Sequence, residues 1–319
     1  MNFQPYPTKF GHFALAVAVV CALIMLVLID VLLRQTVPST IFWLLVATLL
    51  AVGATITAVY CSIIGFKLKY HLNRNGLIIQ WGLCQKRIPL HHIEEIIPGE
   101  IVEEPIRFRG FELAGLRMGR GESDELGRIA FHTTAPLERT LLVLTPEQTY
   151  GISPQDPSAF LKAWHDRQAL GPTQHWCEEV RRGWPLSIEV LVDPLCWWLV
   201  GSAAVICLAL LGYVSLSYAG LPTLLPVHFD NFGQADRIVD KFNLFILPAV
   251  GGIALGVNLI LGGFIHHREK VAAYMLWGST IVVQLFLWIA TLTITVLYAQ
   301  SKVTYRFVVT ALAVLHSNG

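Results

Sequence analysis

Five long apolar stretches divide the chain, and one mostly polar block stands between the second stretch and the third. A helix needs roughly 20 apolar residues to cross a hydrocarbon layer of about 30 Å. All five stretches meet that length, so the pattern predicts an α-helical membrane protein with about five transmembrane helices and one inserted domain. The predicted spans are Phe13–Leu33, Ile41–Phe66, Leu195–Tyr218, Leu244–Ile265 and Ala272–Tyr298.

These spans divide the chain into three parts. Residues 1–66 form a predicted two-helix transmembrane hairpin, and residues 67–187 form the inserted domain. Residues 188–319 form a predicted three-helix membrane region, with a loop at 219–243 on the outer side of the membrane.

Inside the polar block, the apolar period changes from helical to the two-residue alternation of half-buried strands. The dipeptide Asn75-Gly76 is a strong hairpin signal between two such strands. Asp156 is a good helix N-cap and Pro157 suits the first helical position, so a helix to about Arg167 closes the block. The pattern predicts a bent antiparallel sheet with a C-terminal helix. Its expected strands are Lys69–Asn73, Leu77–Leu83, Gln85–Leu90, Arg128–Thr134, Thr140–Thr145 and Tyr150–Ser153.

Composition and charge narrow the classes of function. Hydrophobic residues make up 54% of the chain and charged residues 14%, which fits a membrane protein diluted by a polar domain. The net charge of +1 gives no general attraction to nucleic acid, so the bilayer is an expected partner and nucleic acid is not. None of the six cysteines forms a Cys-x-x-Cys motif, which argues against a zinc site or a disulfide framework.

The orientation follows from basic residues near the ends of the spans, which favour the cytoplasmic side. These basic residues all fall on the cytoplasmic side of the membrane if the N-terminus and the polar block are cytoplasmic. The C-terminus is then outside. Lys302 and Arg306 argue against that last point. The apolar tail Val303–Leu315 is too short to span, so we expect it to lie along the interface or to form a strand. The basic residues are Lys9, Lys67, Lys69, Arg74, Arg181, Arg182, Arg268 and Lys270.

The polar block also carries a known pattern of residues. In order, they are Tyr70-His71-Leu72, Asn75-Gly76-Leu77, Trp81-Gly82-Leu83, Lys86-Arg87-Ile88-Pro89-Leu90, Ile93, Gly127-Arg128-Ile129, Leu142-Val143, Ile152-Ser153-Pro154, Asp156-Pro157 and Phe160. With them, the stretch from Lys67 to Arg167 resembles a bacterial pleckstrin-homology-like (PH-like) domain. The resemblance implies a seven-stranded bent sheet closed by a helix, a fold used mainly for binding.

Four arginines cluster in the middle of the block, directly after an acidic run. We interpret this stretch as a solvated loop with local charge pairing. A loop that docks a partner or faces the anionic inner leaflet is the alternative, and the arginines are then binding residues. A phosphoinositide site is not expected, because several basic residues would have to converge on the first hairpin turn, which contains only Arg74. The cluster comprises Arg107, Arg109, Arg117 and Arg120, and the acidic run comprises Glu94, Glu95, Glu100, Glu103 and Glu104.

The segment between the third and fourth spans contains a second pattern, LPxxxPxHFxxxGxxD, which ends at Asp236. It is similar to an uncharacterised bacterial membrane domain that also opens the SdpI-type bacteriocin-immunity proteins. Ile238-Val239 replace the Trp-Gly often found there, which puts any function of that dipeptide in doubt. His228, Asp230 and Asp236 are the candidate binding residues. We expect His228 to hydrogen-bond a loop carboxylate; a zinc or manganese site and an external pH sensor are the alternatives.

Few polar groups lie within the spans. Asn258 and Gln284 are expected to hydrogen-bond between helices. The motif Gly252-x-x-x-Gly256 permits close packing, either within the chain or between two copies in a homo-oligomer. Adjacent histidines such as His91-His92 point to different faces, which is poor geometry for holding a metal. No fingerprint of a known catalytic or nucleotide-binding site appears, and neither a cofactor nor a metal is predicted.

The sequence thus predicts a non-catalytic, multi-pass protein of a bacterial cytoplasmic membrane. Its expected role is to hold a protein partner as a scaffold, or to sense the state of the envelope, through the PH-like domain. An immunity or transport function, carried by the spans and the His228 loop, is the alternative.

Overall fold

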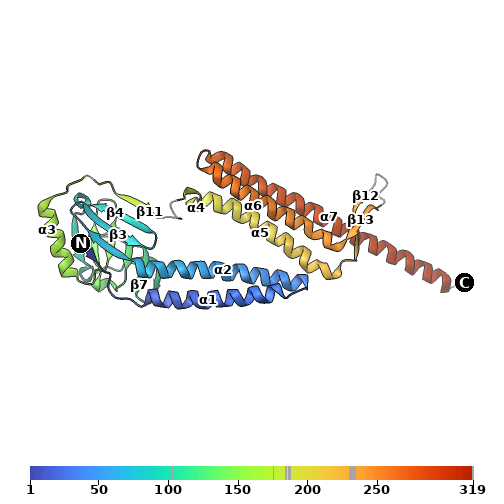
Figure 1. Cartoon of the computed structure of the whole chain (residues 1–319), viewed down its shortest axis with the longest axis horizontal. Coiled ribbons are helices and arrows are strands. Elements are labelled where there is room, and N and C mark those ends of the chain that lie inside the picture. Colours follow the sequence, from blue (N-terminus) through green and yellow to red (C-terminus); the bar gives the residue numbers. More distant parts are fainter. Residues whose placement is uncertain (103, 175, 184, 186–187, 230–234, 318–319) are drawn as a thin grey trace. The chain divides into compact units, whose positions relative to one another are not determined.

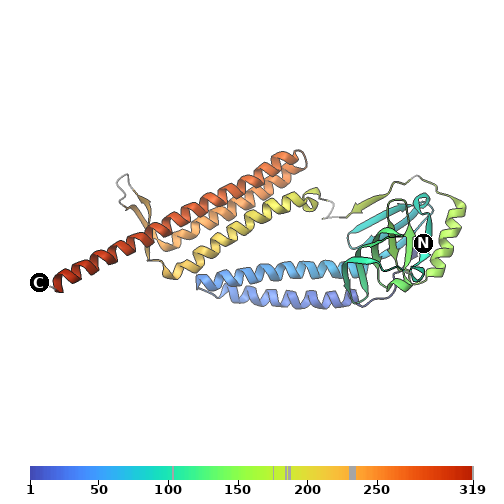
Figure 2. The same cartoon turned by 180° about the vertical axis from the view of Figure 1, so that it is seen from behind.

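The computed structural model describes residues 1–102, 104–174, 176–183, 185, 188–229 and 235–317. Of these, residues 226–229, 235–238 and 297–317 are described by their backbone alone. The described chain divides into two compact units. The first comprises Met1–Asp30 with Ala47–Ser187, and the second comprises Val31–Val46 with Ile188–Gly319. Figures 1 and 2 show the order of the elements within each unit from two opposite sides.

Five helices of the described residues are long and apolar enough to cross a membrane. They confirm the five predicted spans and suggest a multi-pass membrane protein. Helices α1 and α2 run side by side, as do α5, α6 and α7 (Figures 1 and 2). The helices are α1 (Phe10–Leu33), α2 (Pro38–Lys67), α5 (Pro194–Ser217), α6 (Ile246–His266) and α7 (Lys270–Ser317); the shorter α3 (Pro157–Leu170) and α4 (Glu189–Val192) lie outside the spans.

Two sheets build the β-rich domain of the first unit. One has the order β1-β2-β3-β4-β11 and the other β5-β9-β10-β8-β7-β6. Helix α3 begins as predicted, because the Asp156 carboxylate accepts a hydrogen bond from the Ala159 amide and Pro157 occupies the first turn. The strands are β1 (Asn2–Phe3), β2 (Lys69–Leu72), β3 (Gly76–Trp81), β4 (Cys84–Pro89), β5 (Glu95–Pro98), β6 (Arg107–Leu113), β7 (Leu116–Ser123), β8 (Gly127–Thr133), β9 (Leu141–Leu144), β10 (Thr149–Ile152) and β11 (Glu179–Arg182).

The domain departs from the sequence prediction in three ways. Its strands form two sheets, where one seven-stranded bent sheet was expected. Strand β10 lies parallel to β8, with Tyr150 opposite Ala130, so the arrangement is not wholly antiparallel. The arginine cluster was predicted as a solvated loop, which is wrong, because it forms the β6–β7 hairpin. The alternation of apolar and polar residues is hard to recognise in β6. Most of its side chains are exposed, and its arginines and glycine interrupt the two-residue period.

The core of the domain extends into the membrane hairpin. Phe10 and Ala14 of α1 belong to the same buried cluster as Leu68 and Tyr70, which follow α2. Burying a Phe side chain stabilises a fold by about 1.5–3 kcal/mol. At the helix contact, a Cβ on Gly65 would lie 2.7 Å from the Cα of Gly11, so only glycine fits. The domain and the adjoining turns of α1 and α2 are therefore one packed body.

Polar groups hold the helices of the second unit together. The Asn258 side chain donates to Thr280 Oγ1 at 2.8 Å, and the Gln284 side chain donates to the Gly251 carbonyl at 2.8 Å. Both contacts confirm the predicted hydrogen bonds between helices. Gly252 and Gly256 face open space, so the predicted motif makes no close contact within the described part of this chain.

The tail was also predicted incorrectly in part. Helix α7 continues through Val303–Leu315 to Ser317, so no strand forms there. The sequence 297–317 contains neither proline nor glycine, and nothing in it breaks the helix. Between α5 and α6, the backbone forms a two-stranded hairpin of β12 (Leu224–Phe229) and β13 (Ala235–Asp240).

Candidate functional site

The β6–β7 hairpin places the arginine cluster. Seven residue pairs run from Arg107 opposite Glu122 to Leu113 opposite Leu116. Ala114 and Gly115 connect the strands with φ values of 48° and 90°, the left-handed conformation that a tight hairpin turn of this kind requires. The Thr8 hydroxyl, just before α1, donates to the Ala114 carbonyl at 2.7 Å. The turn is therefore held at the start of the first membrane helix.

The two faces of this hairpin use their arginines differently. Arg117 packs its guanidinium 4.6 Å from the ring centre of Phe108, and its Nε lies 3.2 Å from a Glu112 oxygen. Its charge is thus paired and its stem helps to cover the second sheet. The opposite face carries Arg109 directly across from Arg120, while Arg107 lies across from Glu122.

On this face, Arg109 and Arg120 bring two positive charges together. Both side chains are exposed, and neither forms an ion pair with a described residue. Like charges directly opposite one another destabilise a strand pair, so this position carries an energetic cost. We name these two residues the arginine pair. Such an arrangement can hold an anion.

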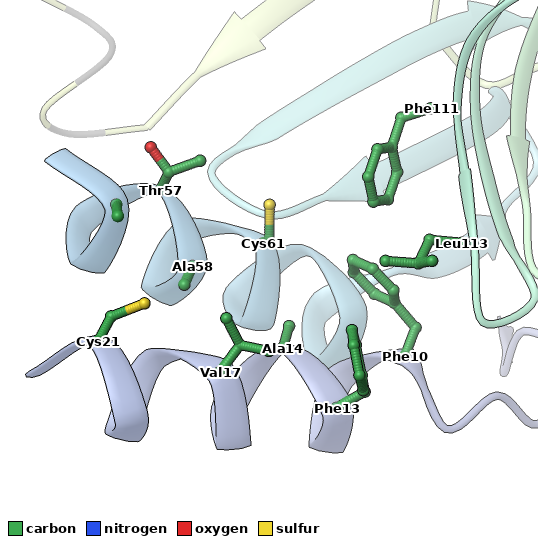
Figure 3. A pocket seen from close by; sticks show the side chains of 11 residues that line it. Phe10, Phe13, Ala14, Val17, Cys21, Thr57, Ala58, Cys61, Phe111 and Leu113 are labelled. Carbon is green, nitrogen blue, oxygen red and sulfur yellow. The ribbon is translucent and has the colours of Figure 1, made fainter. Parts of the chain in front are cut away.

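An apolar groove lies between α1 and α2 on the side toward the hairpin. Its volume is about 360 Å³, and Phe13, Val17, Ala54 and Ala58 line it, with Phe111 and Leu113 of the hairpin at one end. Figure 3 shows Phe111 reaching from β6 toward Phe10 at the start of α1. The two rings meet edge to face, with their centres 5.6 Å apart. We name this feature the α1–α2 groove.

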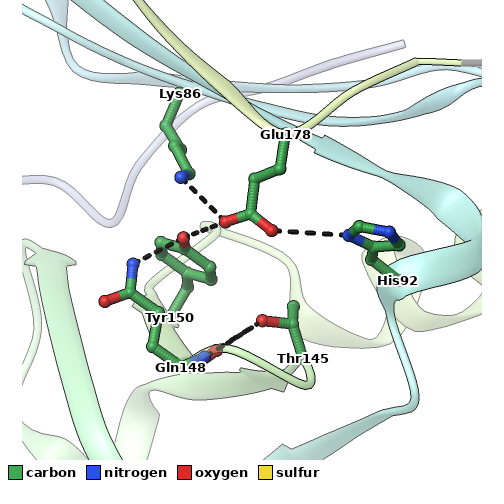
Figure 4. A network of polar contacts seen from close by, with 6 residues as sticks. All are labelled: Lys86, His92, Thr145, Gln148, Tyr150 and Glu178. Carbon is green, nitrogen blue, oxygen red and sulfur yellow. Dashed lines mark hydrogen bonds and ion pairs between the residues drawn. The ribbon is translucent and has the colours of Figure 1, made fainter.

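A buried carboxylate fastens the segment that leaves the domain. Glu178 directly precedes β11, and its side chain is only 5% exposed. Lys86 Nζ lies 2.7 Å from Oε1, the Tyr150 hydroxyl donates to the same oxygen, and His92 Nδ1 lies 3.5 Å from Oε2 (Figure 4). The following strand, β11, then pairs with the edge of β4. The sequence indicated none of this, because Lys86, Tyr150 and Glu178 are far apart along the chain.

The surroundings set the charge states of this network. Burial would by itself raise the pKa of Glu178, but hydrogen bonds from Lys86 and Tyr150 outweigh it and hold that pKa below its usual value. Burial would lower the pKa of Lys86, yet its hydrogen bonds to Glu178 and Tyr150 hold that pKa above its usual value. The pair is therefore ionised at neutral pH and acts as a charged latch.

A second polar cluster lies at the start of α5. Asp193 caps that helix, and its Oδ2 atom accepts hydrogen bonds from His266 at 2.8 Å and Tyr274 at 2.6 Å. The bonds from Tyr274 and His266 lower the pKa of Asp193 to about 2. The cluster ties the start of α5 to the end of α6 and the start of α7. The two partners lie more than 70 residues from Asp193 along the chain, so the sequence did not indicate them.

The remaining candidates lie in the β12–β13 hairpin. His228 is paired with Arg237 along the backbone, and Asp236 is the neighbour of Arg237. Asp230 lies outside the described residues, as do the side chains of His228 and Asp236. The predicted hydrogen bond of His228 therefore stays a prediction. Among the residues that were searched, no group of three or more histidine, cysteine or acidic side chains is placed to hold a metal ion.

Comparison with known proteins supports the resemblance to a PH-like domain and finds an uncharacterised domain in the second region, but it does not confirm the SdpI-like resemblance. A family model described as a bacterial PH domain matches residues 68–168, which run from the start of β2 into α3. A second model, described as a domain of unknown function (DUF1648), matches residues 205–252. Searches of curated proteins and of solved structures gave no match. The β-rich region is thus similar to a bacterial PH domain, and we call it the PH-like domain.

Replacing Glu178 by Gln should lower the stability of the full chain in detergent by about 1–3 kcal/mol at neutral pH, because Lys86 loses its charged partner. The pKa of Glu178 is lowered on folding, so its contribution is present above its ordinary pKa of 4.5 and is lost as the pH falls below that value. Thermal unfolding should therefore show a gap between the two proteins that narrows in acid.

The matched control is Glu147→Gln, which changes an exposed carboxylate of the same domain. An equal loss of stability in both variants, or a gap that stays constant from pH 7 to pH 4, would contradict the latch.

Proposed function

We propose that this protein is a non-catalytic binding module of a bacterial cytoplasmic membrane. In this proposal the PH-like domain holds a protein partner at the cytoplasmic surface. The observation that carries the proposal is the continuous core, in which Phe10 and Ala14 of α1 pack with the sheet residues Tyr70 and Leu77. A domain tethered by a flexible linker would not share its core with the membrane helices.

The shared core gives the role its physical basis. A partner held by the domain is held at a fixed place relative to α1 and α2, since the contact at Gly11 and Gly65 leaves no space for a shift. A change in the packing of these helices would also reach the sheets directly. The same arrangement therefore supports both forms of the proposal, scaffolding and sensing of the envelope.

A groove on the PH-like domain offers a surface for the partner. Its volume is about 490 Å³, and it lies between the N-terminal segment, the turns around Glu100 and Glu138, and the start of α3. Leu141 and Leu161 give it an apolar lining. We name it the acidic groove. The Arg139 guanidinium does not neutralise it fully, because it packs over the Tyr6 ring at 5.3 Å and donates to the Tyr6 hydroxyl.

The expected partner therefore presents an extended segment with a basic residue. Charges at the edge of such a groove mainly set specificity and the rate of association, while the apolar part contributes affinity. The acidic run in the sequence contributes Glu100 to this surface, whereas none of the four arginines predicted to bind a partner lines it.

A photoreactive amino acid at Ser158, in the groove, should capture one stoichiometric partner in living cells. The same amino acid at Lys162 should not, since Lys162 is exposed on the same helix but does not line the groove. The double change Glu100→Lys and Glu138→Lys should abolish the capture, because it replaces attraction by repulsion. Mass spectrometry of the cross-linked product measures the outcome. Equal capture from both positions, or none from either, would contradict the proposed partner surface.

The cytoplasmic placement of the domain rests on the basic residues near the helix ends. Lys67 ends α2, Arg268 lies between α6 and α7, and Lys270 begins α7. With these residues on the cytoplasmic side, the β12–β13 hairpin is extracytoplasmic.

The exposed thiol of Cys177 provides a direct test of this orientation. A membrane-impermeant maleimide should label Cys177 in inside-out vesicles and leave it unlabelled in intact spheroplasts. Cys177→Ser identifies the labelled residue, because the labelling in vesicles should disappear in that variant. Labelling of Cys177 in intact spheroplasts would contradict the orientation.

The binding role is favoured over an immunity or transport function. The SdpI-like resemblance covers the β12–β13 hairpin, where the structure offers a backbone pairing between His228 and Arg237. Buried carboxylates or basic groups usually mark a transport pathway. In the described part of the last three spans, the ionisable contact between Asp193 and His266 lies at the helix ends, and the polar contacts of Asn258 and Gln284 serve helix packing.

A further inference from the structure

The α1–α2 groove is suited to a hydrocarbon chain. Phe13, Val17 and Ala54 are apolar, and the one hydroxyl in the lining, of Thr57, already donates to the Gly53 carbonyl at 2.8 Å. The volume of about 360 Å³ falls within the usual range for a small-ligand site. The groove follows two helices that are long and apolar enough to span a bilayer, and in a bilayer its open side would face acyl chains.

The arginine pair lies next to one end of this groove. Phe111, which lines the groove, shares a face of the hairpin with Arg109, because the two residues are two positions apart on the same strand. Their Cα atoms are therefore about 7 Å apart along the strand. Arg120 lies directly across from Arg109. The long side chains of both residues can reach the groove end near Phe111.

We propose that the α1–α2 groove and the arginine pair together bind one anionic glycerophospholipid. An acyl chain lies in the groove, and the phosphate lies at Arg109 and Arg120. The order of features along the structure matches the order within the lipid. The apolar helix surface corresponds to the acyl chain, and the arginine pair, beyond the ring of Phe111, corresponds to the phosphate. Two guanidinium groups bind a phosphate well, since each offers several N–H donors in one plane.

The proposal explains a feature that the fold alone does not. Two arginines opposite one another repel in the absence of an anion, and each would be relieved by a phosphate between them. Arg117 needs no such partner because it contacts Glu112, and Arg107 lies across from the acidic Glu122 instead of a second arginine. The two positive charges of Arg109 and Arg120 thus favour a lipid with a net negative headgroup over a zwitterionic lipid.

Native mass spectrometry of the full chain in detergent tests this proposal. The protein is mixed with equal amounts of phosphatidylglycerol and phosphatidylcholine that carry the same acyl chains. The natural sequence should retain one phosphatidylglycerol in preference to phosphatidylcholine. In the variant Arg109→Gln/Arg120→Gln, that preference should fall by about five-fold for each arginine removed. The control Arg107→Gln/Arg128→Gln removes the same charge from neighbouring positions of the same sheet face and should keep the preference.

A second pair of variants tests the place of the acyl chain. Ala54→Phe fills the groove at an exposed position and should reduce the retention of phosphatidylglycerol. Val59→Phe adds bulk to an exposed position of α2 outside the groove and should leave retention unchanged. An excess of glycerol 3-phosphate should not displace the lipid, because it lacks the chain.

Several outcomes would overturn the proposal. Equal retention of both lipids by the natural sequence would exclude a headgroup site. An equal loss in the Arg107→Gln/Arg128→Gln control would show diffuse attraction to the surface. Retention by Ala54→Phe, or displacement by glycerol 3-phosphate, would show that the acyl chain does not occupy the groove.

Discussion

The contact between the start of α1 and the end of α2 is the constraint on which the first unit depends. Gly11 and Gly65 bring the two backbones together, and Phe10 fills the space beneath the first sheet. Both sheets are therefore connected to the membrane hairpin through packed residues. Leu68 begins the sheet core directly after the last turn of α2, and Thr8 binds the β6–β7 turn directly before α1.

Two features of the PH-like domain follow from this constraint. The β6–β7 hairpin is held with its apolar end at the α1–α2 groove, and the chain beyond α3 is returned to the domain by Glu178 and β11. The latch matters because the segment it holds leads on to the second unit. A domain fixed in this way can present a binding surface at a constant position, which is the basis of the proposed function.

Much of this fold could be predicted from the sequence. The five spans and six strands of the PH-like domain follow from the hydrophobic period, and Asp156 identified the start of α3 through local chemistry. Contacts between distant residues could not be predicted in this way. Glu178 meets Lys86 and Tyr150, and Arg109 meets Arg120, only because strand register brings them together. The hairpin was missed for a local reason, since its exposed strand β6 lacks an apolar period.

Hydrogen exchange of the variant Gly65→Ala tests the shared core most directly. The added Cβ would lie 2.7 Å from the Gly11 backbone and must push α1 away from α2. Faster exchange of the β2 and β3 amides is expected, because Phe10 moves with α1. The control Gly53→Ala has open space around its added Cβ and should change nothing in the sheets. If Gly65→Ala alters exchange in α1 and α2 but leaves β2 and β3 unchanged, the domain and the membrane hairpin do not share one core.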